Sequence, residues 1–203
     1  MADLSFVHTH APGDPARAPL LLLHGTGGNE HDLVPLVPEI APGRAFVSPR
    51  GKVLENGMPR FFRRLSEGVF DEADVRARAD ELAGFVSEMR AAYGLAAPVA
   101  VGFSNGANIA AALMWRHPGV LAGAVLWRAM TPLREAPAGG LDGTPVLIVS
   151  GAMDPIVPAA DVGDLAARLR EAGASVTHET LPVGHGLTRP DLDLARQFLA
   201  TAG

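Results

Sequence analysis

The chain has 203 residues, of which 48% are hydrophobic and 19% charged, and this composition predicts one soluble globular domain over residues 1–203. Its net charge of -5 argues against nucleic acid or an anionic membrane as a partner, because either would require clustered basic residues. The absence of cysteine excludes disulfides, thiolate metal sites and a cysteine nucleophile. No secretory leader or apolar run of membrane-spanning length is visible, so we expect a cytoplasmic protein with no membrane attachment.

Apolar runs of strand length alternate with helical patterns along the chain. The first strand, within 4–10, is partly alternating, as at a sheet edge, whereas the continuous apolar run at 19–23 is typical of a central strand buried on both faces. Further strands are predicted at 44–48, 99–102, 120–127, 145–149 and 176–181. Helices are predicted at 31–40, 71–93 and 107–115. Two more helices are expected, one that contains Leu165, Leu169 and Ala172 and one that begins after Thr188. This order predicts an α/β fold with a mostly parallel central sheet flanked by helices.

Two of the predicted helices carry clear end signals. Gly94 follows the amphipathic segment 71–93 at the position that glycine favours after a helix. Thr188 precedes the last helix and Asp191 lies three residues later, which is a capping pattern. Only about 16 residues separate the strand ending at Trp127 from the next one, so we expect no lid domain there.

The segment 49–70 has no clear periodicity. A structureless stretch of about 20 residues inside a compact domain is usually either functional or wrongly assigned, and we interpret this one as a wall of the binding cleft. Phe61 and Phe62 could line that cleft or could equally be core residues that hold the segment in place.

The same segment contains three arginines, at positions 60, 63 and 64, beside the two phenylalanines. We hypothesise that at least one of them faces the cleft and favours a substrate with an anionic group. The alternative is that all three are solvated or pair with nearby acids such as Glu67, Asp71 and Glu72.

A G-x-S-x-G motif at 102–106 lies between a short apolar strand and an Ala-rich helix. This is the context of a nucleophile elbow, in which a tight turn exposes the serine hydroxyl, and Gly102 and Gly106 avoid clashes around Ser104. The motif alone is weak evidence, because about one shuffled chain in ten of this composition would contain it. Other elements must therefore support the prediction.

A second glycine-rich segment, His24-Gly25-Thr26-Gly27-Gly28, directly follows the buried strand at 19–23. It lacks the spacing of a phosphate-binding loop. Backbone N–H groups free of bulky side chains can instead stabilise an oxyanion, so we interpret it as an oxyanion loop, with a plain glycine turn as the alternative.

Ser104, Asp154 and His185 each follow a predicted strand, in that chain order. Because parallel strands bring their carboxyl ends to one edge of a sheet, we expect the three side chains to share one site. A serine nucleophile needs a base, and the base needs a carboxylate that fixes its tautomer. Singly, Asp154 could be a turn former and His185 a loop residue; if the acid lay elsewhere, Asp142 or Asp161 would be the next candidates.

The motifs His24-Gly25-x-Gly27, Gly102-Phe103-Ser104-x-Gly106, Asp154-Pro155-x-Val157-Pro158 and Gly184-His185 resemble those of a known family. It is the small carboxylesterase, lysophospholipase and acyl-protein-thioesterase-like branch of the α/β-hydrolases, and the resemblance, strongest to its bacterial hydrolases, extends over nearly the whole chain. It implies an α/β-hydrolase fold, with Ser104 as nucleophile, Asp154 as acid and His185 as base.

The resemblance further implies that the backbone amides of Thr26 and Asn105 form the oxyanion hole. Asn105 stands where the thioesterases usually have Gln, and Thr26 where they usually have Leu, so long-chain acyl-protein substrates are not expected. The residues expected to bind substrate are His24, Gly25, Gly27, Arg60, Phe61, Met130 and Met153.

The sequence thus favours a serine esterase that cleaves small or short-acyl carboxylic esters, a small-molecule ester being its partner. A lysophospholipase or thioesterase, and a non-catalytic α/β-hydrolase scaffold that binds a small ligand, are the alternatives. We expect no cofactor and no metal, since the His8-x-His10 pair has no third ligand nearby. A homodimer is left open.

Overall fold

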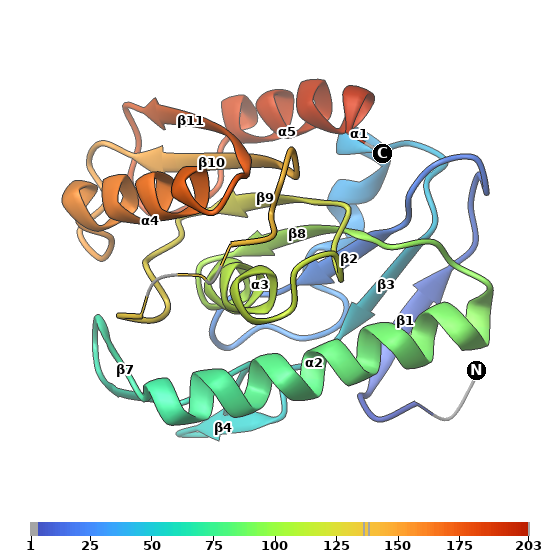
Figure 1. The fold of residues 1–203 in the computed structure, drawn as a ribbon, viewed down its shortest axis with the longest axis horizontal. Helices are drawn as coiled ribbons and strands as arrows, with labels where there is room; N and C mark the ends of the chain where they lie inside the picture. Colours follow the sequence, from blue (N-terminus) through green and yellow to red (C-terminus); the bar gives the residue numbers. More distant parts are fainter. Residues whose placement is uncertain (1–3, 136, 138, 203) are drawn as a thin grey trace.

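The computed structural model describes residues 4–135, 137 and 139–202. Within them a seven-stranded sheet has the order β1-β3-β2-β8-β9-β10-β11 (Figure 1). Its strands are β1 (His8–Ala11), β2 (Leu20–Leu23), β3 (Phe46–Pro49), β8 (Val99–Phe103), β9 (Gly123–Trp127), β10 (Pro145–Gly151) and β11 (Ser175–Leu181). Only the edge strand β1 is antiparallel to its neighbour among these strands, so the sheet is mostly parallel, as predicted.

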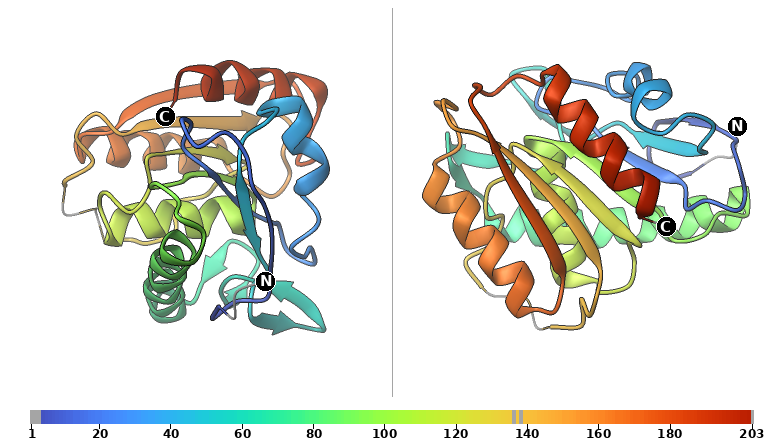
Figure 2. Two further views of the ribbon diagram at one scale, coloured as in Figure 1. Left: turned by 90° about the vertical axis from the view of Figure 1, so that its right-hand side faces the viewer. Right: turned by 90° about the horizontal axis from the view of Figure 1, so that it is seen from above.

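Helices cover both faces of the sheet (Figure 2). They are α1 (Val37–Ile40), α2 (Glu72–Tyr93), α3 (Asn105–Arg116), α4 (Ala159–Glu171) and α5 (Arg189–Thr201). The core on one face contains α2, α3 and α4, and the core on the other contains α1 and α5. This layering is the α/β-hydrolase architecture expected from the sequence.

The four leucines of β2 are all fully buried and alternate between the two cores. Leu21 and Leu23 pack under α2 and α3, whereas Leu20 and Leu22 pack with the α1 and α5 side. A strand with helices on both faces needs apolar side chains at every position, which confirms the interpretation of the 19–23 run.

The end signals of α2 and α5 are confirmed. The Asp71 carboxylate caps α2 by accepting the N–H of Asp74, and Gly94 follows with a positive φ of 65°. At α5, Thr188 and Asp191 form the reciprocal capping box.

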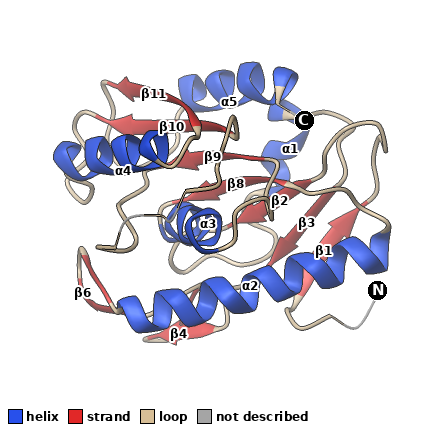
Figure 3. Ribbon diagram, viewed as in Figure 1, coloured by secondary structure: helices blue, strands red, loops and turns tan. Residues whose placement is uncertain are grey.

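The segment 49–70 is not structureless, and that prediction was wrong. It forms two hairpins, β4 (Val53–Glu55) with β5 (Met58–Arg60), and β6 (Arg64–Ser66) with β7 (Val69–Phe70) (Figure 3). The strands have only two or three residues, too few for a detectable alternation. The Asn56-Gly57 turn, with φ values of 51° and 79°, was the available signal, because two positive φ angles define the common two-residue hairpin turn.

The helix expected at 31–40 is present only as a 3-10 turn, η1 (Val34–Leu36), followed by the single turn α1. The described residues between β9 and β10 form no helix or strand. None of the helices in the described chain has the length and apolar character needed to cross a membrane.

Candidate active site

The elbow at Ser104 has the predicted strand, turn and helix. Ser104 follows β8 with φ of 51° and ψ of -113°, and α3 begins at the next residue. A Cβ atom at Gly102 would lie 2.6 Å from the carbonyl oxygen of Gly106, and one at Gly106 would overlap the carbonyl of Leu23. Both glycines are therefore required for the turn and for the close packing of α3 on β2.

The side chains of Ser104, His185 and Asp154 form one hydrogen-bonded chain. His185 Nε2 lies 3.0 Å from Ser104 Oγ, and His185 Nδ1 lies 2.8 Å from Asp154 Oδ2. The Asp154 side chain is fully buried, whereas that of His185 is 21% exposed. The N–H groups of Ile156 and Val157 donate to the other carboxylate oxygen of Asp154. This is the arrangement by which an imidazole can take a proton from a serine hydroxyl while a carboxylate holds its tautomer.

The other two candidate acids have different surroundings. Asp161 Oδ2 accepts the N–H of Thr131 at 2.7 Å, and burial raises the pKa of Asp161. Asp142 lies against Gly173, at the opposite end of β10 from Asp154. The geometry therefore singles out Asp154 as the carboxylate of the hydrogen-bonded chain.

Thr26 and Asn105 line the cleft at Ser104 from two sides. Asn105 is the first residue of α3, where a backbone N–H has no acceptor within the helix. Among the described residues the N–H of Thr26 likewise has no backbone acceptor. Two free donors beside the hydroxyl are the expected components of an oxyanion hole.

His24, Gly25 and Gly27 shape the neighbouring loop and do not line the cleft. His24 is buried, with Nδ1 2.7 Å from the carbonyl oxygen of Gly25 and Nε2 accepting the N–H of Gly51 at 3.0 Å. Burial lowers the pKa of His24, which suits the neutral ring that this pairing requires. Gly27 has a φ of 82° and donates its N–H to the carbonyl of Pro59. These three residues support the loop at the site, and their role in substrate binding stays a prediction.

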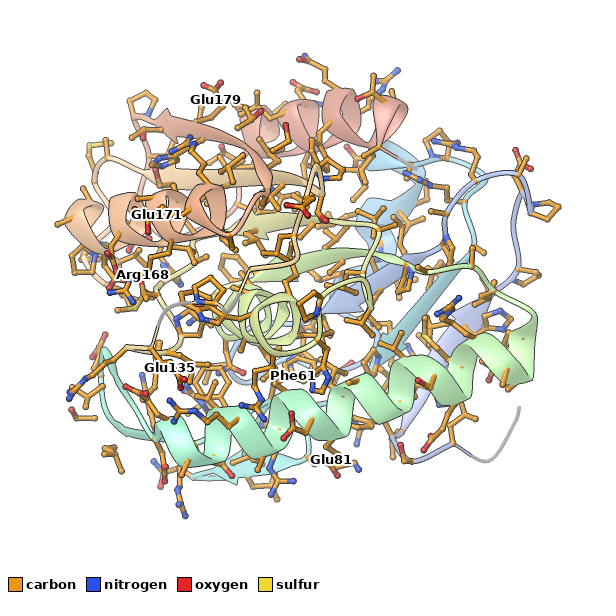
Figure 4. All side chains as sticks on the ribbon, in the orientation of Figure 1. Phe61, Glu81, Glu135, Arg168, Glu171 and Glu179 are labelled. Carbon is orange, nitrogen blue, oxygen red and sulfur yellow. The ribbon has the colours of Figure 1, made fainter. Side chains whose placement is uncertain are left out.

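Phe61 is a core residue. Its side chain is 3% exposed, packs on the His24 ring with centroids 4.7 Å apart, and lies near α2 (Figure 4). The alternative that the two phenylalanines hold the segment in place is therefore confirmed. Met130 does line the cleft at Ser104, whereas Met153 is 66% exposed and lies outside it.

Two of the three arginines line the cleft. The Arg60 side chain is 3% exposed, its Nη1 lies 2.9 Å from Glu55 Oε2, and burial lowers the pKa of Arg60. Arg64 Nε donates to the other oxygen of Glu55 at 2.9 Å. Arg63 is exposed and pairs with Asp71 instead. One carboxylate thus serves two guanidinium groups at the cleft, while an exposed carboxylate, Glu67, lies on its rim.

The cleft at Ser104 is small, with a volume of about 40 Å³, room for roughly three water-sized groups. A larger hollow of about 240 Å³ lies between the β6–β7 hairpin and α4, and it shares Gly68 and Phe70 with the cleft. The two hollows therefore adjoin, a tight one at the serine and a wider one beyond it.

Sequence reasoning missed two buried polar residues of the cleft, Asn108 and Arg128. Asn108 is buried one turn after Ser104 in α3, and its side-chain oxygen accepts the N–H of Met130 at 2.8 Å. Arg128 is fully buried at the end of β9. A polar residue inside an Ala-rich helix and an arginine after a buried strand were the available signals.

The chain belongs to the phospholipase/carboxylesterase family, whose model matches residues 5–202, and it has the α/β-hydrolase fold. It is 45% identical over 185 residues to the Bacillus subtilis (strain 168) protein named "Putative hydrolase MhqD", covering 90% of this chain and 92% of that protein.

Solved structures agree with this assignment. The Bacillus cereus carboxylesterase superposes with a TM-score of 0.96 at 43% identity, covering 99% of this chain and 96% of that one. YahD, solved with malic acid, superposes with a TM-score of 0.91 at 29% identity, covering 98% and 100%. The protein is therefore a hydrolase of a carboxylesterase family.

Proposed function

We propose that the protein is a serine carboxylesterase that cleaves small or short-acyl esters through an acyl-Ser104 intermediate. The observation that carries the proposal is the hydrogen-bonded chain from Ser104 Oγ through His185 to the buried Asp154 carboxylate. Membership in the carboxylesterase family supports the same reaction class.

In the acylation step, Ser104 Oγ attacks the ester carbonyl carbon while His185 Nε2 takes the hydroxyl proton. The carbonyl oxygen becomes negative and accepts hydrogen bonds from the N–H groups of Thr26 and Asn105. The C–O bond to the alcohol then breaks, and the imidazolium returns its proton to the leaving oxygen. Asp154 keeps the imidazole oriented and stabilises its charged form.

Deacylation repeats these steps with water. His185 takes a proton from the water as its oxygen attacks the acyl carbon, and then returns that proton to Ser104 as the acyl–serine bond breaks. This step releases the carboxylic acid and regenerates the Ser104 hydroxyl, while the alcohol has already left during acylation.

The shape of the cleft supports a short acyl group. About 40 Å³ beside Ser104 accommodates a few heavy atoms, whereas the adjoining hollow of about 240 Å³ can hold a larger part of the substrate. We therefore assign the acyl group to the small cleft and the alcohol side to the wider hollow.

We further propose that Arg64, and behind it Arg60, favours a substrate with a carboxylate. Glu55 is the carboxylate paired with both guanidinium groups of the cleft, and among the described residues Glu67 on the rim forms an ion pair with neither of them. YahD, a structural relative, was solved with malic acid, an anionic compound, and this is consistent with the proposal.

The test combines active-site labelling with a substrate panel. A fluorophosphonate should label the wild-type protein and leave Ser104→Ala unlabelled, which separates an enzyme from a ligand-binding scaffold. Turnover of p-nitrophenyl esters should then be greatest for acetyl to butyryl groups and should fall for octanoyl and longer groups. Absence of both labelling and turnover would overturn the proposal, and preference for long-chain thioesters or lysophospholipids would reassign the substrate.

A further inference from the structure

Arg128 is a fully buried arginine at the carboxyl end of β9, and its backbone has a φ of 56°. Arginine is almost never fully buried unless it is paired, and a positive φ is strained for a residue with a long side chain. Both features persist only where the surrounding structure stabilises them. The side-chain contacts of Arg128 therefore indicate what its placement achieves.

The guanidinium of Arg128 holds both sides of the loop that carries His185. Its Nε donates to the carbonyl of Gly184 at 3.0 Å, and its Nη2 donates to the carbonyl of Gly186 at 3.0 Å. These are the two residues that flank His185. Glycines give a loop little stiffness of its own, so the position of the imidazole depends on such contacts.

Asp191 completes the arrangement from α5. Its carboxylate pairs with Arg128 through two bonds of 2.7 and 3.0 Å, with both side chains fully buried. The same carboxylate accepts the N–H and the hydroxyl of Thr188, at the end of the His185 loop. The loop is therefore fixed to β9 by Arg128 and to α5 by Asp191.

The backbone at Arg128 is also tied to the elbow. The carbonyl of the preceding residue, Trp127, accepts the N–H of Ser104 at 2.8 Å. A short path thus runs from the Ser104 backbone through β9 and the Arg128 side chain to the residues on either side of His185.

We propose that Arg128, with Asp191 as its counterion, is a positioning residue that holds His185 within reach of Ser104. The inference rests on the proposed serine-esterase function. A displacement of a catalytic group by about 1 Å can lower the rate about 100-fold, so loss of the clamp should reduce kcat more than it changes KM.

The main variants are Arg128→Lys and Arg128→Gly. Lysine keeps the charge but cannot span two carbonyls and a carboxylate as the planar guanidinium does. Glycine relieves the positive φ and opens a cavity next to the cleft. We expect kcat and the rate of fluorophosphonate labelling to fall about 10- to 100-fold in both variants, with KM changed less than threefold. Added guanidinium chloride at non-denaturing, millimolar concentration should partly restore the rate of Arg128→Gly.

Arg44 provides a matched control. It is another buried arginine that binds α5 through backbone carbonyls, those of Leu199 and Ala202, but at the far end of the helix. Arg44→Lys and Arg44→Gly should lower Tm without changing the labelling rate per folded molecule, and guanidinium should not increase the rate of Arg44→Gly.

Two results would overturn the proposal while leaving the serine-esterase function intact. One is a wild-type labelling rate in folded Arg128→Lys. The other is an equal loss of rate in the variants at position 44 and in the variants at position 128. If neither Arg128 variant folds, Asp191→Asn supplies the test, because it weakens the clamp while keeping a side chain that can accept from Thr188. A folded Asp191→Asn with unchanged kcat would likewise reject the clamp. Failure of the wild-type protein to be labelled would instead remove the underlying function.

Discussion

The side chain of Asn105 accepts a hydrogen bond from the backbone N–H of Phe61 at 2.7 Å, although 44 residues separate them. Asn105 directly follows Ser104, and Phe61 directly follows the β4–β5 hairpin. One amide side chain thus attaches the segment that carries the cleft arginines to the elbow. The shape of the cleft should depend on this bond.

We therefore expect Asn105→Ala to raise KM severalfold with a smaller change in kcat, because the backbone N–H of residue 105 remains. The buried N–H of Phe61 loses its acceptor, which should lower the free energy of unfolding by about 1–3 kcal/mol. Steady-state kinetics and urea denaturation measure the two effects. An unchanged KM with the expected loss of stability would show that the bond does not shape the cleft.

Ser104→Ala and His185→Ala should each reduce kcat by several orders of magnitude, and the double variant should be little worse than either. The two side chains share one hydrogen bond and act as a unit. Once one of them is gone, removal of the other should therefore lower kcat little further. The comparison requires single-turnover rates for all three variants. Losses that multiply in the double variant would contradict the triad.

Substrate charge should matter through Arg60 and Arg64 and not through Arg63. We expect Arg64→Ala, and to a lesser degree Arg60→Ala, to lower kcat/KM selectively for a carboxylate-bearing ester, by about 1.5–3 kcal/mol of transition-state binding. A neutral ester of the same size gives the reference. Arg63→Ala is the matched control, because Arg63 is exposed and pairs with Asp71 outside the cleft. Equal effects on both esters in all variants would reject the anionic preference.

The ion pair of Glu30 and Arg50 should make stability fall in acid. Hydrogen bonding to Arg50 lowers the pKa of Glu30 from 4.5 to about 2, with bonds of 2.5 and 2.6 Å. Because the pKa is lowered on folding, the pair stabilises the protein above about pH 4.5 and progressively less as the pH falls toward 2. Arg50 is 44% exposed, so solvent screening makes the contribution smaller than the pKa shift alone would imply.

Glu30→Gln should therefore lower the free energy of unfolding at pH 6 and lower it much less near pH 2.5, as measured by urea denaturation. Glu39→Gln is the control, since Glu39 pairs with Arg189 on the surface and such pairs contribute little. A cost of Glu30→Gln that is the same at both pH values would rule out the ion pair as the cause.

Chelators should leave esterase activity unchanged, because the proposed chemistry needs a neutral imidazole and no metal. The described residues contain no group of three or more His, Cys, Asp or Glu side chains arranged for a metal ion. Activity after dialysis against EDTA, with and without added zinc, checks this expectation. Loss of activity that zinc restores would overturn it.

Local signals made much of the fold predictable. The leucine run of β2, the caps of α2 and the glycines around Ser104 each specify their conformation within a few residues. The order of Ser104, Asp154 and His185 after parallel strands was enough to expect them together, since topology brings strand ends to one edge.

Contacts between distant residues were not predictable in this way. Arg128 and Asp191 are 63 residues apart, and neither the end of a strand nor a helix cap indicates that they pair. The Asn105–Phe61 bond also depends on how the hairpins pack. The β4–β5 hairpin itself could have been found from Asn56-Gly57, whose turn chemistry is local.

The capping box at Thr188 and Asp191 connects the start of α5 with the loop that carries His185. Because Asp191 both belongs to the capping box of α5 and pairs with Arg128, unwinding of the first turn of α5 should also release the loop of His185. Terminal helices open locally at a lower free energy than the whole molecule. We therefore expect the active site to lose its geometry through this local opening before the central sheet unfolds, and hydrogen exchange at the backbone amides of residues 188, 189, 191 and 192 measures it.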